Sequence, residues 1–178
     1  MQLYYIPNLF DEAELKIIDN VISDDQWDIA EVGFQKSMPG IRSTKIKRID
    51  DDILNKKLAQ SFFKANNYYK FIIIKVHDVG ILKYNIGDYY KKHVDIGGPD
   101  DLKAGFPSRK LSLIVSLSNN NDYEGGDILF HTDENPINMK KKYNTGTFFP
   151  SYVLHEVTKI KKGTRYSLVA WAIGEPFK

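Results

Sequence analysis

No cysteine occurs among the 178 residues of this chain. That absence excludes disulfide bonds, iron–sulfur clusters and thiolate metal sites, and it is typical of a reducing compartment. No apolar run approaches the roughly 20 residues that a membrane-spanning helix needs, and the first residues lack the basic and apolar regions of a signal peptide. The formal net charge is only +2, too small to indicate a nucleic-acid or membrane partner. We therefore predict a cytoplasmic protein.

The residues that are present have the composition of an ordinary globular domain, with 42% hydrophobic and 27% charged residues. A chain of this length forms one domain of normal size, and no repeat or low-complexity tract divides it. We expect a single domain over residues 1–178, in which residues 1–79 support a core formed by residues 80–173. The expected oligomeric state is a monomer or a weak dimer.

Hydrophobic periodicity changes near residue 70. A capping box at Asp11 and Glu14 begins a first helix, and a second helix is predicted over residues 52–65. Beyond residue 70 the apolar period is 2, which indicates strands. The predicted strands are 2–6, 27–34, 70–77, 79–86, 110–118, 126–131, 145–149, 152–157 and 165–173. Many short strands after two helices predict a mainly β fold with supporting helices (α+β), an antiparallel sandwich or barrel with the helices packed outside.

The tripeptide His93-Val94-Asp95 is the first candidate site. In an extended strand, residues i and i+2 project to the same face, so His93 and Asp95 would present an imidazole and a carboxylate together. His155, in an apolar strand expected to lie beside them, needs partners for its nitrogens. Two histidines and one carboxylate with open positions form the ligand set of non-haem Fe(II) oxygenases. The alternatives are a surface role for His93 and a hydrogen-bonded core role for His155. One of Tyr89 and Tyr90 is a candidate pocket wall.

Arg165 is the second part of the pattern. The segment 161–163 is expected to turn the chain, so that the returning strand brings Arg165 near the strand of His155. The residues that follow it have the pattern of a buried strand, which favours a buried, paired guanidinium over a surface arginine. Because a guanidinium binds a carboxylate through two parallel hydrogen bonds, a five-carbon dicarboxylate could chelate the metal at one end and meet Arg165 at the other.

Several motifs occur in order within residues 80–173. They are Tyr84-x-x-Gly87 before His93-x-Asp95, Glu124-Gly125-Gly126-Asp127, Gly146-x-Phe148-Phe149-Pro150-Ser151-x-x-x-His155-Glu156-Val157, and Gly163-x-Arg165-Tyr166-x-x-x-x-Trp171. As a set they resemble the prolyl 4-hydroxylase branch of the Fe(II)/2-oxoglutarate dioxygenases. The resemblance covers about half of the chain and implies a double-stranded β-helix (jelly-roll) core, with N-terminal helices packed on one sheet.

The resemblance also implies roles for the matched residues. The family's iron ligands correspond to His93, Asp95 and His155. Arg165 matches the basic residue that holds the C5 carboxylate of 2-oxoglutarate, and Tyr84 matches a tyrosine that lines the cosubstrate pocket.

Further positions bear on the substrate and the cosubstrate. Arg109 and Trp171 match positions that contact the peptide in peptidyl-prolyl hydroxylases. Where some relatives have a tyrosine as second partner of the C5 carboxylate, this chain has Ser116 or a neighbour. The hydroxyl group of Ser112, Ser116 or Thr147 could take that place, and the sequence leaves all three open.

The implied activity is Fe(II)- and 2-oxoglutarate-dependent hydroxylation of a prolyl residue in a peptide or protein. O2 is consumed, succinate and CO2 are released, and ascorbate is an optional reductant. The expected partner is a proline-containing peptide in a groove rimmed by residues 97–109 and Trp171. A hydroxylase of a free amino acid or other small molecule stays open, as does, less favoured, a non-catalytic jelly-roll binding module. A nucleic-acid demethylase is disfavoured because no second arginine follows Arg165 in its strand.

Overall fold

The structure is a computed structural model, and it describes residues 3–30, 40–96 and 108–176. The elements in chain order are β1 (Tyr4–Pro7), α1 (Glu12–Ser23), β2 (Asp28–Ile29), β3 (Arg42–Ser43), β4 (Lys45–Arg48), α2 (Asp52–Tyr69), β5 (Lys75–Tyr84), β6 (Tyr89–His93), β7 (Ser108–Ser116), β8 (Tyr123–Gly125), β9 (Ile128–Phe130), β10 (Ile137–Asn138), β11 (Thr145–Pro150), β12 (His155–Val157), β13 (Ile160–Gly163) and β14 (Arg165–Gly174). The predicted change from helices to strands near residue 70 is confirmed.

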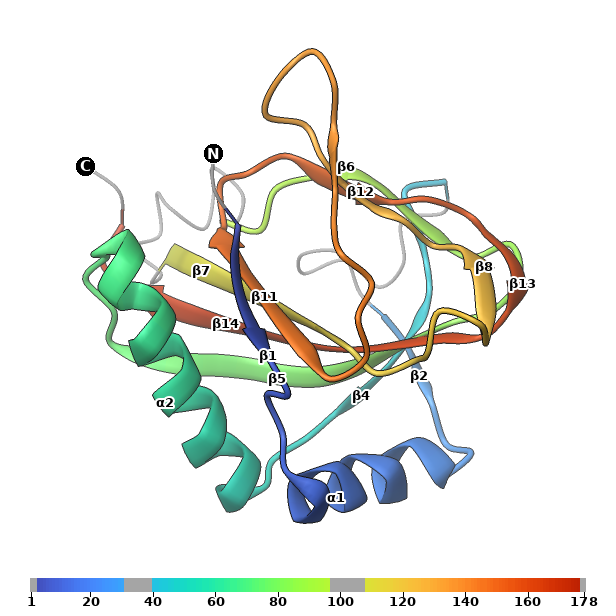
Figure 1. The fold of residues 1–178 in the computed structure, drawn as a ribbon, viewed down its shortest axis with the longest axis horizontal. Coiled ribbons are helices and arrows are strands. Elements are labelled where there is room, and N and C mark those ends of the chain that lie inside the picture. Colours follow the sequence, from blue (N-terminus) through green and yellow to red (C-terminus); the bar gives the residue numbers. More distant parts are fainter. Residues whose placement is uncertain (1–2, 31–39, 97–107, 177–178) are drawn as a thin grey trace.

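The strands form two facing sheets. The larger has the order β1-β11-β7-β14-β5-β4-β2, the smaller has the order β10-β9-β12-β6-β3, and β13 pairs with β8 at one end. Every pairing within them is antiparallel. Figure 1 shows β6 and β12 lying over the larger sheet. The chain is therefore a mainly β sandwich, as predicted.

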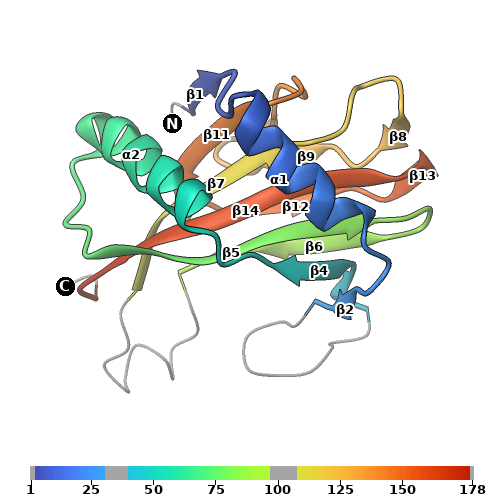
Figure 2. The ribbon, with the colours of Figure 1, turned by 90° about the horizontal axis from the view of Figure 1, so that it is seen from below.

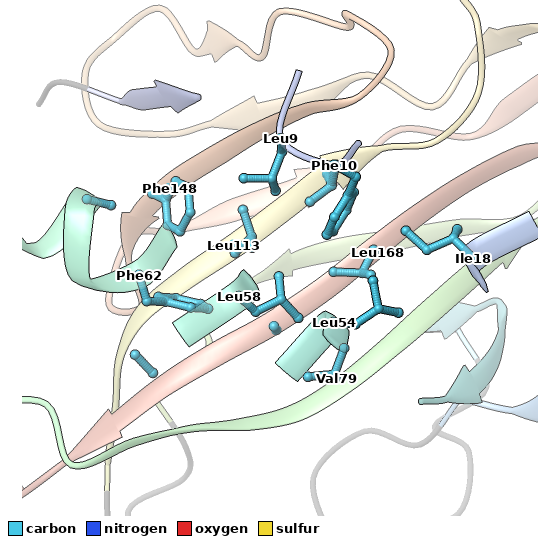
Figure 3. Close-up of a cluster of buried hydrophobic side chains, with 14 of the residues drawn as sticks. Leu9, Phe10, Ile18, Leu54, Leu58, Phe62, Val79, Leu113, Phe148 and Leu168 are labelled. Carbon is cyan, nitrogen blue, oxygen red and sulfur yellow. The ribbon is translucent and has the colours of Figure 1, made fainter. Parts of the chain in front are cut away.

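Both helices cover the outer face of the larger sheet, as Figure 2 shows. The Asp11 side chain accepts a hydrogen bond from the Glu14 N–H and the Glu14 carboxylate accepts one from the Asp11 N–H, so the predicted capping box is confirmed. Apolar side chains of α2 then fill the space under the sheet (Figure 3). Phe62 meets Phe148 of β11 edge to face, with ring centroids 5.2 Å apart. The predicted packing of helices on one sheet is confirmed.

A second apolar cluster lies between the two sheets. It contains Leu82 and Val169 of the larger sheet and Phe130 and Val157 of the smaller one. Buried polar and ionisable side chains, among them Ser112, His155 and Arg165, accompany these apolar residues. The space between the sheets therefore contains residues that can bind a metal ion or a charged ligand.

Three predicted boundaries are wrong for identifiable reasons. Helix α2 continues to Tyr69 because the Asn66 side chain bonds to the backbone of Phe71 and extends the helix end. The two strands predicted over 70–77 and 79–86 are one strand, β5, which passes through Asp78 with a positive φ of 62°. Segment 161–163 is part of strand β13 and not a free turn.

Other expectations fall beyond the described ranges. The end of the predicted strand 27–34 and most of the predicted loop 97–109 lie outside the described residues. Within the described ranges, neither helix is long and apolar enough to cross a lipid bilayer.

Candidate active site

Three residues that could hold a metal ion meet between the sheets. His93, Asp95 and His155 each offer one ligand atom, and these atoms all lie within 4.8 Å of one another. His93 and His155 stand directly opposite each other on the neighbouring strands β6 and β12. The Asp95 carboxylate approaches both imidazoles, with its Oδ1 3.7 Å from Nε2 of His93 and its Oδ2 3.8 Å from Nε2 of His155. The structure therefore brings together the three predicted ligands.

One part of the geometric prediction needs correction. His93 is the last residue of β6, and Asp95 lies two residues beyond the end of that strand. A backbone hydrogen bond of 2.7 Å from the Asp95 N–H to the Ser151 carbonyl holds the segment. Contact with the turn after β11, and not strand alternation alone, therefore places the carboxylate.

Hydrogen bonds set both imidazoles in the same tautomer. Nδ1 of His93 lies 2.8 Å from the Lys91 carbonyl, and Nδ1 of His155 lies 2.9 Å from the Val153 carbonyl. A carbonyl only accepts, so each Nδ1 carries a proton, and in the neutral form of each ring Nε2 has the lone pair directed at the site. A backbone carbonyl on the second nitrogen is the usual support of a metal-binding histidine.

The protonation states also suit a metal. Burial lowers the pKa of His93 to about 4, and the neighbouring His155 acts in the same direction. Burial alone would raise the pKa of Asp95, but His155, His93 and a hydrogen bond from Trp171 outweigh it and hold that pKa below its usual value. His93 is therefore neutral and Asp95 ionised at neutral pH, as metal ligands must be.

Aromatic rings enclose the imidazoles. Tyr90 stacks on His93 with ring centroids 3.4 Å apart, and Phe149 meets His155 edge-on at 4.9 Å. Tyr90 also lines a cavity of about 150 Å³ that reaches all three predicted ligands. The prediction that one of Tyr89 and Tyr90 forms a pocket wall is confirmed for Tyr90.

Arg165 begins β14, which pairs with β5 and β7 and not with the His155 strand. The returning strand therefore belongs to the larger sheet and the strand of His155 to the smaller one, because the chain crosses over after β13. Arg165 is 3% exposed, and its guanidinium lies 5.2 Å from the ring of Tyr84, which lines the cavity. Nη1 donates to Ser167 at 3.3 Å, whereas the buried Nη2 has no hydrogen-bond partner within the described residues. A buried guanidinium nitrogen without a partner fits a carboxylate ligand.

Three arginines, Arg42, Arg48 and Arg109, line the cavity together with Trp171. The Arg109 guanidinium lies 3.8 Å above the Trp171 ring, and its Nη2 is 2.8 Å from the carboxylate of Asp78. Arg48 pairs with the same carboxylate, and the Arg42 guanidinium lies 4.6 Å from the centre of the Tyr90 ring.

Sequence reasoning missed some of these residues. Asp78, Arg42 and Arg48 carry no motif, and only the fold brings them to the cavity. Ser112 was a candidate for the cosubstrate carboxylate, but its hydroxyl group donates to Asp95 at 2.7 Å. Among the other candidates, Thr147 has a buried hydroxyl without a hydrogen-bond partner in the described structure.

Comparison with known proteins now identifies the class. The sequence profile of the 2OG-Fe(II) oxygenase superfamily matches residues 79–173, more than half of the chain. The chain therefore belongs to the 2OG-Fe(II) oxygenase superfamily. Membership implies Fe(II), 2-oxoglutarate and O2 as cofactors, and the tautomers and spacing of the two histidines and the aspartate fit the metal.

Curated relatives bear the name PKHD-type hydroxylase. One from Gloeothece citriformis is 30% identical over 97 residues, which cover 54% of this chain and 43% of the relative. Another from Prochlorococcus marinus is 29% identical over 147 residues, which cover 76% of this chain and 63% of the relative. The chain thus spans about half the length of the curated relatives that it matches.

Solved structures agree on the fold. A prolyl-4-hydroxylase from Pseudomonas putida superposes with a TM-score of 0.76 at 18% identity, covering 97% of this chain and 92% of the other. A prolyl hydroxylase from Trichoplax adhaerens, in complex with a hypoxia inducible factor peptide fragment, gives 0.76 at 18% identity, with 96% and 83% covered. The viral collagen prolyl hydroxylase of Paramecium Bursaria Chlorella virus-1 gives 0.70 at 20% identity, with 98% and 97% covered. The predicted double-stranded β-helix is confirmed.

Proposed function

We propose that this chain is an Fe(II)- and 2-oxoglutarate-dependent dioxygenase that hydroxylates a prolyl residue in a peptide or protein. The observation that carries the proposal is the meeting of His93, Asp95 and His155, with both Nδ1 atoms bonded to backbone carbonyls and both Nε2 atoms facing one carboxylate. These residues would hold Fe(II) on one face and leave its other positions open.

In this proposal Arg165 holds the C5 carboxylate of 2-oxoglutarate. The support is its burial and the lack of a partner for Nη2 within the described structure, which a carboxylate would satisfy. Leaving such a donor buried and unpaired is costly, so the cosubstrate would remove an existing penalty. Tyr84 pairs with Arg165 across β5 and β14 and lines the cavity, so it would form the wall of the cosubstrate pocket beside Arg165.

Bound iron, together with 2-oxoglutarate and O2, supplies the oxidising chemistry that places one oxygen atom on a C–H bond and the other in succinate, with release of CO2. The chain's own residues bind and orient. His93 and His155 offer fixed lone pairs, Asp95 supplies a negative charge, and the rings of Tyr90 and Phe149 exclude water from the imidazoles.

A peptide substrate is supported by two residues that line the cavity and by the resemblance to prolyl hydroxylases. Arg109 and Trp171 line the cavity that reaches the candidate metal site, so a peptide bound over that site would touch them. The Trichoplax adhaerens neighbour is described in complex with a peptide fragment. Proline carries a preset φ and extended geometry, so ordering such a segment in a groove costs little.

The test is an assay with Fe(II), 2-oxoglutarate, ascorbate and a library of proline-containing peptides. Succinate release and a mass gain of one oxygen atom on proline are the expected results. His155→Ala should abolish both. His131→Ala is the matched control, because His131 lies next to the same sheet but bonds to Glu156.

The outcomes separate the alternatives. Succinate release without a modified peptide would favour a free amino acid or another small molecule as substrate. Metal binding without turnover under any condition would favour a non-catalytic binding module. Full turnover by the His155→Ala variant would remove His155 from the metal site.

A further inference from the structure

The Asp95 carboxylate is held on one side only. Its Oδ2 accepts two hydrogen bonds, from the Trp171 indole Nε1 at 2.9 Å and from the Ser112 hydroxyl at 2.7 Å. A carboxylate oxygen has two lone-pair directions, so these two donors fill Oδ2. Among the described residues no hydrogen bond reaches Oδ1, the oxygen that lies nearer Nε2 of His93.

Both donors are themselves fixed. Ser112 is 1% exposed and its hydroxyl also bonds to the Ser151 hydroxyl at 2.9 Å. The carbonyl of Ser151 in turn accepts the Asp95 N–H. Ser112 and Trp171 are paired opposite each other on β7 and β14. Two central strands of the larger sheet therefore bind Asp95, which lies beyond the end of β6.

The second donor, Trp171, contacts Arg109, another residue that lines the cavity. The guanidinium of Arg109 lies 3.8 Å above the Trp171 ring. A cation over the face of an indole draws electron density from the ring and makes its N–H a stronger donor. Arg109 is held there by Asp78. One line of contacts therefore runs from the surface of the cavity to the carboxylate.

We propose that Trp171 and Ser112 are positioning residues that fix Asp95 with Oδ1 alone offered to the metal. The carboxylate would then bind the metal through one oxygen, and the cosubstrate and O2 would keep the positions that a second oxygen would occupy. This inference rests on the proposed function, and it gives Trp171 a task besides contact with the substrate.

The test uses Co(II), whose visible absorption depends on the number and geometry of its ligands, as a probe of the metal site. Trp171→Phe keeps a ring under Arg109 but removes the indole N–H, and Ser112→Ala removes the hydroxyl. Removing a group that orients a metal ligand commonly weakens metal affinity by about ten- to hundredfold. We expect each variant to lose Co(II) affinity in that range and to change the Co(II) spectrum.

Matched controls exist for both changes. Trp27→Phe also removes an indole N–H, one that donates to the Asp24 carbonyl away from the cavity. Ser108→Ala removes a buried hydroxyl from the same strand, one that bonds to nothing in the described structure. Both controls should bind Co(II) like the wild type. Thermal unfolding of all four variants separates lost positioning from lost folding.

The outcomes distinguish this inference from the proposed function. If the wild type binds Co(II) and both Trp171→Phe and Ser112→Ala retain its affinity and spectrum, the positioning role is wrong and the dioxygenase proposal stands. If the wild type binds no Co(II), both proposals are wrong. Weaker binding with an altered spectrum in the two folded variants, but not in the controls, supports the role.

Discussion

The two faces of the larger sheet are both largely buried, but they differ in polarity. On β7 and β14, the side chains directed at the helices are apolar, as with Leu111, Val115 and Ala170. The alternate positions of the same strands carry buried polar side chains among apolar ones, including Ser112, Ser167 and Arg165. Burial therefore does not separate core from site in this molecule. The polarity of a buried face does, because polar groups are rarely placed where water is excluded without a function.

The two faces also differ in whether their buried polar groups have hydrogen-bond partners. The helix-side face gains stability from apolar area removed from water, at about 25 cal/mol per Å². The cavity side includes Arg165 and Thr147 atoms that are buried without a hydrogen-bond partner among the described residues. Such groups lower stability until a ligand satisfies them. The comparison predicts that changes on the helix side affect folding and changes on the cavity side affect binding.

The largest effect is expected on the helix side. Phe62 is 1% exposed and packs against Phe148, and Phe62→Ala leaves a cavity that should cost about 3–5 kcal/mol of unfolding free energy. Denaturant unfolding measures this loss. At temperatures where the variant stays folded, its Co(II) spectrum should equal that of the wild type.

The neighbouring residue provides the control. Phe63 is 74% exposed, so Phe63→Ala should change the unfolding free energy by about 0.5 kcal/mol or less. Similar losses for the two variants would show that the helix face is not the main source of stability, and the comparison would fail on that side.

The next effect is expected on the cavity side. Arg165→Met keeps the length and apolar stem of the side chain but removes the charge. A hydrogen bond to a charged group contributes about 1.5–3 kcal/mol, so the KM for 2-oxoglutarate should rise roughly ten- to hundredfold. Stability should stay the same or increase, because a buried and incompletely paired charge is lost. Kinetics over a range of 2-oxoglutarate concentrations, with an unfolding curve, measures both.

Lys83→Met is the control for that variant. Lys83 lies on β5, next to the strand of Arg165, but its ammonium group lies over the ring of Tyr166, which packs against the helix-side cluster. An unchanged KM in Arg165→Met, or an equal rise in Lys83→Met, would remove Arg165 from the cosubstrate site.

Sequence patterns predicted the helices and the central strands because each has a strong period of its own. Periodicity did not predict β6, whose residues Tyr89–His93 have no apolar alternation. A strand at His93 was inferred only from the spacing of His93 and Asp95. That strand exists because β12 and β3 pair with it. The three candidate metal ligands and Arg165 were found by motif. Asp78 and the arginines beside it, and the contacts of Ser112 and Trp171 with Asp95, depend on packing between distant strands, which no local pattern encodes.

The smallest effect tests whether the helix layer can be loosened without reaching the cavity. Asp11→Ala removes one half of the capping box of α1, and the loss of an N-cap side chain costs about 1 kcal/mol. Glu14, which loses that partner, still pairs with Lys57 of α2 at 3.2 Å, so the contact between the helices should persist.

The control is Asp25→Ala, an exposed change just past the same helix, which should alter the unfolding free energy less. If the comparison holds, Asp11→Ala lowers only the unfolding free energy, and both metal affinity and the KM for 2-oxoglutarate match the wild type. A shift in either constant would mean that the two faces of the sheet are coupled, since only a single layer of strands separates them.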